Sequence, residues 1–154
     1  MKGLKTKDVS VKAKQGQYGI VFTSWNPSIV QDLLKETKKE LVSQGVDEAN
    51  IYLKEVPGAF ELPLATQFMA EKEGILSVIS LGAIIRGDTP HFDFISSSCL
   101  EGLQEVSLKT RIPVICGVLT TNTIEQAEER SNPNKMNKGK EFALTALNMV
   151  DSLS

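Results

Sequence analysis

The sequence contains little of what several classes of protein require. Its 154 residues include only two cysteines, one tryptophan and one histidine. Cys99 and Cys116 are too far apart for a CxxC redox or zinc motif, and no set of His, Cys and acidic residues has metal-site spacing. We therefore expect two buried free thiols and no metal centre.

Neither sign of charge dominates, and no hydrophobic run is long. The 17 basic and 19 acidic residues are interspersed and give a formal net charge of −2, so the chain lacks the basic stripe of a nucleic-acid-binding protein. No apolar run approaches the roughly 20 residues that cross a bilayer. The first ten residues, MKGLKTKDVS, do not form the apolar region of a signal peptide. We expect a cytoplasmic protein that binds neither nucleic acid nor membrane.

What is present is the composition of a globular protein, with 41% hydrophobic and 23% charged residues. This length suits one domain with its own core, so we expect a single domain over residues 1–154. Apolar segments at residues 18–23, 51–56, 75–85 and 112–118 each precede a turn and then a helical pattern. Four successive strand–turn–helix units predict an α/β fold with a parallel sheet covered on both faces.

Apolar spacing also predicts the structure of two other segments. Val9, Val11 and Ala13 alternate with polar residues, which is typical of a half-buried strand. Such an N-terminal strand could pair within the sheet or with the edge of another subunit. After the second strand, residues 62–73 have helical spacing and should bury Phe68 together with the other apolar side chains.

The stretch LGAIIRGDTPHFDFISSS, residues 81–98, contains the chain's only histidine. Thr89 suits a helix N-cap and Pro90 the first helical position, so His91 would lie in the first turn of a helix. Unpaired backbone N–H groups there favour an anion, and an imidazole can transfer protons near neutral pH. His91 is therefore a candidate general acid or base beside a candidate phosphate cradle at residues 87–89. A plain turn followed by a cap explains residues 87–89 about as well, and a surface or helix histidine without a role is the more common explanation of His91.

Two familiar nucleotide-binding motifs are absent. Gly82 and Gly87 have the spacing of a P-loop, but Asp88 and Thr89 stand where that motif requires a lysine and a serine or threonine. The chain also has no GxGxxG. Binding of a nucleoside triphosphate is therefore disfavoured.

Other candidate side chains follow the ends of the remaining strands, which a parallel sheet gathers at one edge. Trp25 could stack on a planar heterocycle, or could simply be a packing residue. Glu61 could accept hydrogen bonds from hydroxyl groups, or only favour the dipole of its helix. Arg130 could hold an anion through two N–H groups, or remain an exposed helix residue. Together these residues predict a ligand site at that edge.

Three longer motifs occur in order: VPGAFELP at residues 56–63, GAIIRGDTPHFDFIS at 82–96 and TTNTIEQAEERS at 120–131, followed by NKG at 137–139. They resemble the 6,7-dimethyl-8-ribityllumazine synthase family, and the resemblance covers nearly the whole chain from Tyr18. It implies a flavodoxin-like three-layer α/β/α sandwich around a four-stranded parallel sheet.

The resemblance also implies an activity and an assembly. The family condenses 5-amino-6-(D-ribitylamino)uracil with 3,4-dihydroxy-2-butanone 4-phosphate in riboflavin biosynthesis, and needs no metal or organic cofactor. Its subunits form homopentamers with active sites between neighbours, and in some members twelve pentamers build an icosahedral shell. Two alternatives of similar fold are an archaeal-type riboflavin synthase and a flavin-binding or shell-forming protein without catalysis.

The resemblance assigns proton transfer to His91 and substrate binding to a larger set of residues. In that family Trp25 would stack on the pyrimidine and Arg130 would bind phosphate. Cys116 stands where many members have a bulky apolar residue that a neighbouring subunit offers to the ring. The full binding set that the resemblance implies is Trp25, Ala59, Phe60, Glu61, Ala83, Ile84, Ile85, Asp88, Thr89, Cys116 and Arg130.

Overall fold

Parallel pairing of four strands organises residues 8–154, the part of the chain that the computed structural model describes. The strands are β1 (Gln17–Thr23), β2 (Ile51–Val56), β3 (Ile75–Ile85) and β4 (Val114–Thr121), in the spatial order β2-β1-β3-β4. The predicted parallel sheet is confirmed. The last strand begins and ends later than expected, because its pairing with β3 runs from Val114 to Thr121.

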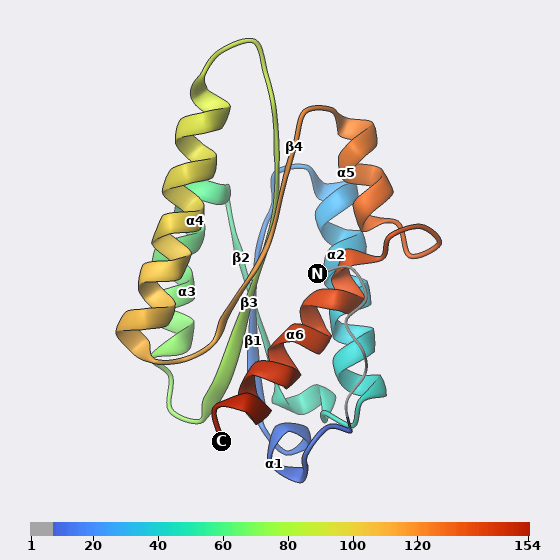
Figure 1. Ribbon diagram of the computed structural model, residues 1–154, viewed down its shortest axis with the longest axis vertical. Coiled ribbons are helices and arrows are strands. Elements are labelled where there is room, and N and C mark those ends of the chain that lie inside the picture. The colour runs from blue at the N-terminus through green and yellow to red at the C-terminus, as the bar shows by residue number, and fades with distance from the viewer. Residues whose placement is uncertain (1–7) are drawn as a thin grey trace.

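Helices cover both faces of the sheet, as Figure 1 shows. On one face lie α2 (Pro27–Ser43), α5 (Ile124–Ser131) and α6 (Lys138–Ser152); on the other lie α3 (Leu62–Ala70) and α4 (His91–Thr110). Two short 3-10 turns, η1 (Glu48–Asn50) and η2 (Ala59–Glu61), flank β2. The layering and strand order are those of a flavodoxin-like fold. None of the helices within residues 8–154 is long and apolar enough to cross a membrane.

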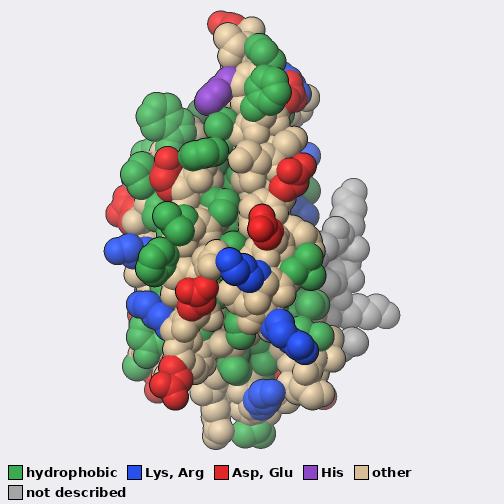
Figure 2. Space-filling view, turned by 90° about the vertical axis from the view of Figure 1, so that its left-hand side faces the viewer, with side chains coloured by type: hydrophobic (Ala, Val, Ile, Leu, Met, Phe, Trp, Pro, Cys, Tyr) green, Lys and Arg blue, Asp and Glu red, His purple; other side chains and the backbone are tan. Residues whose placement is uncertain are grey.

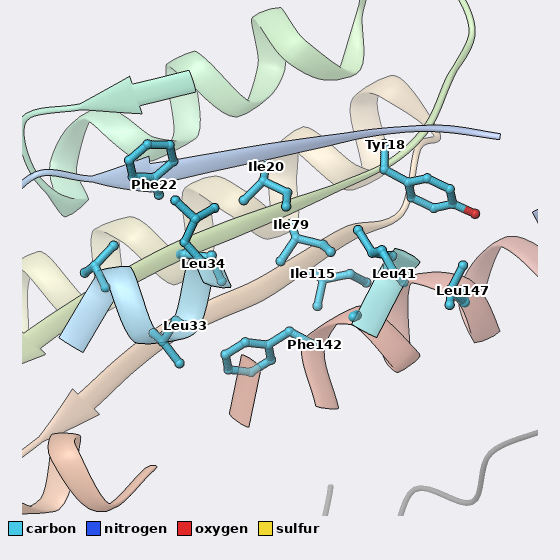
Figure 3. Packing of buried hydrophobic residues seen from close by; sticks show 14 of the residues in the cluster. Tyr18, Ile20, Phe22, Leu33, Leu34, Leu41, Ile79, Ile115, Phe142 and Leu147 are labelled. Carbon is cyan, nitrogen blue, oxygen red and sulfur yellow. The ribbon is translucent and has the colours of Figure 1, made fainter. Parts of the chain in front are cut away.

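The sheet separates two hydrophobic clusters because successive side chains of a strand point to opposite faces. Tyr18, Ile20 and Phe22 of β1 face α2 and α6 (Figure 3), whereas Val21 belongs to the cluster beneath α3 and α4. The Tyr18 hydroxyl donates to the carbonyl of Ala13 at 2.8 Å. Burial raises the pKa of Tyr18, and nearby Asp151 raises it further, so the phenol stays neutral.

The predicted N-terminal strand is wrong: residues 11–14 form the short helix α1 (Val11–Lys14). Ser10 caps this helix by accepting from the N–H of Ala13 at 3.1 Å, and its own N–H donates to Asp151 at 3.1 Å. The alternation does not mark one face of a strand, because Ala13 is buried while Val11 is 67% exposed. Within residues 8–154 this segment therefore adds no fifth strand to the sheet of its own chain.

Two helix predictions also need correction. Helix α3 ends at Ala70, earlier than expected, and Phe68 is 68% exposed rather than buried. Helix α4 starts at His91 with Pro90 in the N-cap position, so Thr89 is not the cap, although its hydroxyl accepts from the N–H of His91 at 3.4 Å. Pro90 makes no side-chain capping bond, but its φ of −68° is the value that the proline ring imposes and leads directly into the helix.

Replacing Gly139 with alanine should destabilise the fold. A Cβ there would lie 2.7 Å from the backbone oxygen of Leu33 and 2.9 Å from the Cβ of Glu36, so α2 and α6 would have to separate. Overpacking costs about 1–3 kcal/mol, which outweighs a helix-propensity gain of about 1 kcal/mol. The melting temperature should fall by several degrees.

The matched control is Gly87→Ala, because a Cβ at Gly87 meets nothing within 4 Å. Calorimetry of both variants tests the close approach of the two helices. A Gly139→Ala protein as stable as the wild type would show that α2 and α6 do not pack this tightly.

Candidate active site

The four turns that follow the strands meet at one edge of the sheet, as the sequence predicts (upper end of Figure 1). A cavity of about 420 Å³ opens there. It lies between the β1–α2 turn, η2, the end of β3 and the start of α4. Its lining residues are Thr23, Trp25, Asn26, Gly58, Ala59, Phe60, Glu61, Ala83, Ile84, Ile85, Gly87, Thr89, His91, Phe92 and Ile95.

An aromatic side chain on a well-held backbone forms one wall. The N–H of Ser24 donates to Val56 at 2.8 Å and that of Trp25 to Pro57 at 3.3 Å, which continues the β1–β2 pairing beyond the strands. The Trp25 side chain itself is 72% exposed. The cavity therefore has an accessible indole whose attachment is fixed, which suits stacking on a planar ring.

Asn26 connects this wall to the centre of the sheet. Its side-chain Nδ2 donates to the carbonyl of Ala83 at 2.9 Å, and its backbone has a φ of 54°, in the left-handed region that asparagine tolerates better than most residues. Pro27 then begins α2. The bond fixes the β1–α2 turn against the end of β3, so two sides of the cavity cannot separate freely.

The turn η2 supplies a carboxylate and a second aromatic ring. The N–H of Glu61 donates to the carbonyl of Gly58 at 3.2 Å. A Cβ at Gly58 would lie 3.2 Å from the Glu61 carboxylate, so a larger residue would crowd that side chain. Phe60 is 63% exposed. Glu61 is therefore an accessible acceptor for hydroxyl groups beside an apolar surface.

The β3–α4 turn brings the imidazole to the cavity. Residues 86–91 are all exposed, and Gly87, Thr89 and His91 line the cavity, together with Phe92 from the first turn of α4. Figure 2 shows the histidine near the upper end of the α3–α4 side of the molecule, beside hydrophobic side chains. Turn N–H groups and an imidazole together suit an anion and a proton transfer.

Three of the predicted site residues do not line this cavity. Asp88 is exposed in the turn between two lining residues. Cys116 lies on the edge strand β4 and is exposed. Arg130 lies in the last turn of α5, on the other face of the sheet, where its Nη1 donates to the carbonyl of Gln126 at 3.0 Å. The remaining predicted residues line the cavity.

The cavity also includes residues that sequence reasoning assigned to no ligand. Gly58 directly precedes Ala59 and Thr23 lies two positions before Trp25, so the ends of the strands could have indicated them. Asn26 precedes Pro27, a pattern that indicates a turn and gives no sign of a ligand-binding side chain. Ile95 lies one turn into α4 on its apolar stripe and also lines the cavity. These additional lining residues are Thr23, Asn26, Gly58, Phe92 and Ile95.

Neither cysteine is an ionised nucleophile near neutral pH. Burial raises the pKa of Cys99 to about 12, with a smaller contribution from Cys116. The prediction that both thiols are buried is wrong for Cys116, which is exposed at the sheet edge. Even so, partial desolvation raises the pKa of its thiol against the opposing effect of a hydrogen bond with the backbone of Val118. Residues 8–154 contain no group of three or more His, Cys, Asp or Glu side chains that could hold a metal ion.

The edge of the sheet thus combines an indole, a carboxylate, an imidazole and an exposed turn that leads into a helix. Such a cavity suits a planar, hydroxylated ligand together with an anionic one. A family model described as 6,7-dimethyl-8-ribityllumazine synthase matches residues 15–154, nearly the whole chain.

Proposed function

The chain belongs to the 6,7-dimethyl-8-ribityllumazine synthase family, and we propose that the cavity at the carboxyl edge of its sheet is the active site. The protein is a transferase of riboflavin biosynthesis. It condenses 5-amino-6-(D-ribitylamino)uracil with 3,4-dihydroxy-2-butanone 4-phosphate, and releases phosphate and water. One observation carries the assignment of the site: residues from four separate segments line one cavity with the chemistry that these two substrates need.

The proposed reaction needs no covalent bond to the enzyme. The uracil amine attacks the ketone and loses water to give an imine. Loss of the proton on the adjacent carbon then expels phosphate and leaves an enol, which tautomerises to a ketone. The ribityl-bearing nitrogen then closes the second ring with loss of another water. Holding two reactants in line lowers the activation barrier by roughly several kcal/mol on its own. The translational and rotational entropy of bringing them together is then lost on binding rather than in the reaction step. The protein's main task is therefore alignment.

Each side of the cavity takes one part of that task. Trp25 stacks on the pyrimidine, residues 59–61 hold the ribityl chain, and the backbone of residues 83–85 contacts the edge of the uracil. Asp88 and Thr89 lie on the phosphate side. His91, which lines the cavity beside this turn, moves protons between the substrates during the imine and elimination steps.

A second copy of the chain completes this site. Arg130 and Cys116 lie away from the cavity of their own chain, so they bind substrate only by reaching the cavity of a neighbour. An apolar groove of about 740 Å³ adjoins the cavity along β2 and α3 and shares Phe60 and Glu61 with it. Leu64 and Phe68 lie exposed in that groove, at 66% and 68%. Exposed apolar surface of this extent supports a subunit interface.

The proposed assembly is a homopentamer, with a sixty-subunit shell as its larger form. Sedimentation of the purified protein separates the monomer, the pentamer and the shell. The proposal extends to a single domain over residues 1–154 and to a cytoplasmic location, which limited proteolysis and cell fractionation would test.

Two assays separate this activity from the alternatives. When both substrates are mixed with the protein, inorganic phosphate and lumazine fluorescence should appear together. Riboflavin formed from lumazine alone would instead indicate an archaeal-type riboflavin synthase, and no turnover at all would indicate a binding or shell protein. The family match lends no support to either alternative.

Trp25→Ala should raise the KM for the uracil substrate about tenfold or more, because stacking of a base on an aromatic side chain contributes about 1–3 kcal/mol. Trp25→Phe keeps a flat ring and should stay within a few fold of the wild type. The KM for the phosphate substrate should change little in either variant. Steady-state kinetics with each substrate varied in turn measure this, and an unchanged uracil KM in Trp25→Ala would remove the indole from the site.

A further inference from the structure

Arg86 lies outside the cavity and joins two segments that line it, the end of β3 and the first turn of α4, to the β4–α5 turn. It follows β3 directly, and its backbone N–H donates to the carbonyl of Thr121 at 2.9 Å. Its Nε donates to the side-chain oxygen of Asn122 at 2.9 Å. Nη1 and Nη2 donate to the two carboxylate oxygens of Asp93 at 3.4 and 3.3 Å. The end of β3, the first turn of α4 and the β4–α5 turn are thus joined by one side chain.

The guanidinium also stacks on a ring that lines the cavity. Its central carbon lies 4.4 Å from the centroid of the Phe92 ring, and Phe92 is one of the lining residues. An arginine that uses its fork on a carboxylate and its face on an aromatic ring has a defined orientation, which a lysine cannot reproduce. Arg86 therefore fixes the first turn of α4 in direction as well as in distance.

The turn between these contacts has little packing of its own. Residues 87–90 are all exposed, and a Cβ at Gly87 would meet nothing within 4 Å. The hydrogen bond from the N–H of His91 to the Thr89 hydroxyl is long, at 3.4 Å. The place of this turn at the cavity therefore depends on how its two ends are held.

We propose that Arg86 is a positioning residue for the condensation. Arg86 directly precedes this turn, and its side chain contacts Phe92 and Asp93 just after it. The link holds Thr89 and His91 at the cavity. Asn122 extends the effect, since its own N–H donates to the side chain of Gln126 at 2.9 Å and so ties the start of α5 to the same cluster. The inference rests on the proposed roles of Thr89 and His91.

The contacts of Arg86 serve position more than global stability. The Arg86 and Asp93 side chains are 44% and 58% exposed, and exposed ion pairs contribute little to the free energy of unfolding. Loss of the side chain should therefore leave the fold intact while the turn moves. Displacements of about 1 Å in a catalytic arrangement can lower a rate by about a hundredfold.

Arg86→Ala should raise the KM for the phosphate substrate and lower kcat, each by roughly tenfold, given that sensitivity to position. The KM for the uracil substrate should stay within about twofold, because Trp25 and residues 59–61 are held by other contacts. Inorganic phosphate should become a correspondingly weaker inhibitor. Arg86→Lys keeps the charge without the fork or the stacking, so it should recover only part of the loss.

The control is Lys109→Ala, which removes one exposed positive charge from the far end of α4 and should leave kinetics unchanged. Asp93→Asn should reproduce the Arg86→Ala effect, and the double variant should be no worse than the single ones. The inference is overturned if Arg86→Ala keeps the wild-type phosphate KM while Thr89→Ala raises it. It is also overturned if both KM values rise together with a large fall in melting temperature. If Arg86→Ala, Thr89→Ala and His91→Ala all leave the kinetics unchanged, the cavity itself is not the active site.

Discussion

Arg130→Ala is expected to raise the KM for the phosphate substrate about a hundredfold and to change kcat much less. Hydrogen bonds to charged groups contribute about 1.5–3 kcal/mol, and the paired N–H groups of an arginine match a phosphate in shape as well as in charge. In the proposed role the contact forms before the reaction and persists during it, so its loss should affect binding more than turnover. Steady-state kinetics with the phosphate substrate varied measure the effect.

Two further variants make this test specific. Arg130→Lys keeps the charge without the fork and should lie between the wild type and Arg130→Ala. Lys12→Ala removes a positive charge from α1, at the opposite end of the molecule (Figure 1), and should have no effect. An Arg130→Ala protein with wild-type kinetics would exclude Arg130 from phosphate binding.

His91→Ala should lower kcat about a hundredfold and leave both KM values nearly unchanged. A positioned general acid or base contributes about 10²–10⁴ to a rate. The lower end applies here because alignment of the two substrates supplies much of the acceleration. The variant should therefore slow turnover without abolishing it.

Added imidazole distinguishes proton transfer from a structural role of this histidine. If the lost group moves protons, free imidazole should restore part of the rate of His91→Ala and have no effect on Arg130→Ala. His91→Gln, which keeps polarity but does not titrate, should be as slow as His91→Ala. Wild-type turnover in either histidine variant would contradict the assigned role.

The sequence predicted the sheet and the edge that carries the cavity because those features depend on local patterns. Apolar runs of strand length, each followed by a turn and a helical repeat, determine a parallel sheet, and a parallel sheet determines which turns meet. Helices α3 and α4 approach closely at Gly102, where a Cβ would lie 2.7 Å from Pro63.

The errors arose where contacts distant in the sequence decide the structure. The alternation at Val9, Val11 and Ala13 fits a strand, but Ser10 finds a partner in Asp151, 141 positions away, and caps a helix instead. Phe68 has the spacing of a core residue but lies exposed in the apolar groove. Hydrophobicity alone does not distinguish a core side chain from one on a surface that another chain could cover.

The extent of the cavity was also beyond local patterns. Asn26 lies in the turn after the first strand, and nothing near it in the sequence indicates that its side-chain amide donates to the carbonyl of Ala83, 57 positions later. Arg86 reads as the end of a strand, yet it joins Asp93 and Asn122. No sequence pattern indicated that Arg130 lies on the opposite side of the sheet from the helix that begins at His91.

The central claim is that two copies of the chain build each active site, one supplying His91 and the other Arg130. Co-expression of His91→Ala chains with Arg130→Ala chains, each with its own affinity tag, yields mixed oligomers that can be purified through both tags. Random assembly leaves about one interface in four with both residues intact. With the phosphate substrate held near the wild-type KM, where both variants alone are slow, we predict about a quarter of the wild-type activity in these oligomers, far above that of either variant alone. Activity no greater than the mean of the two separate variants would contradict the shared site.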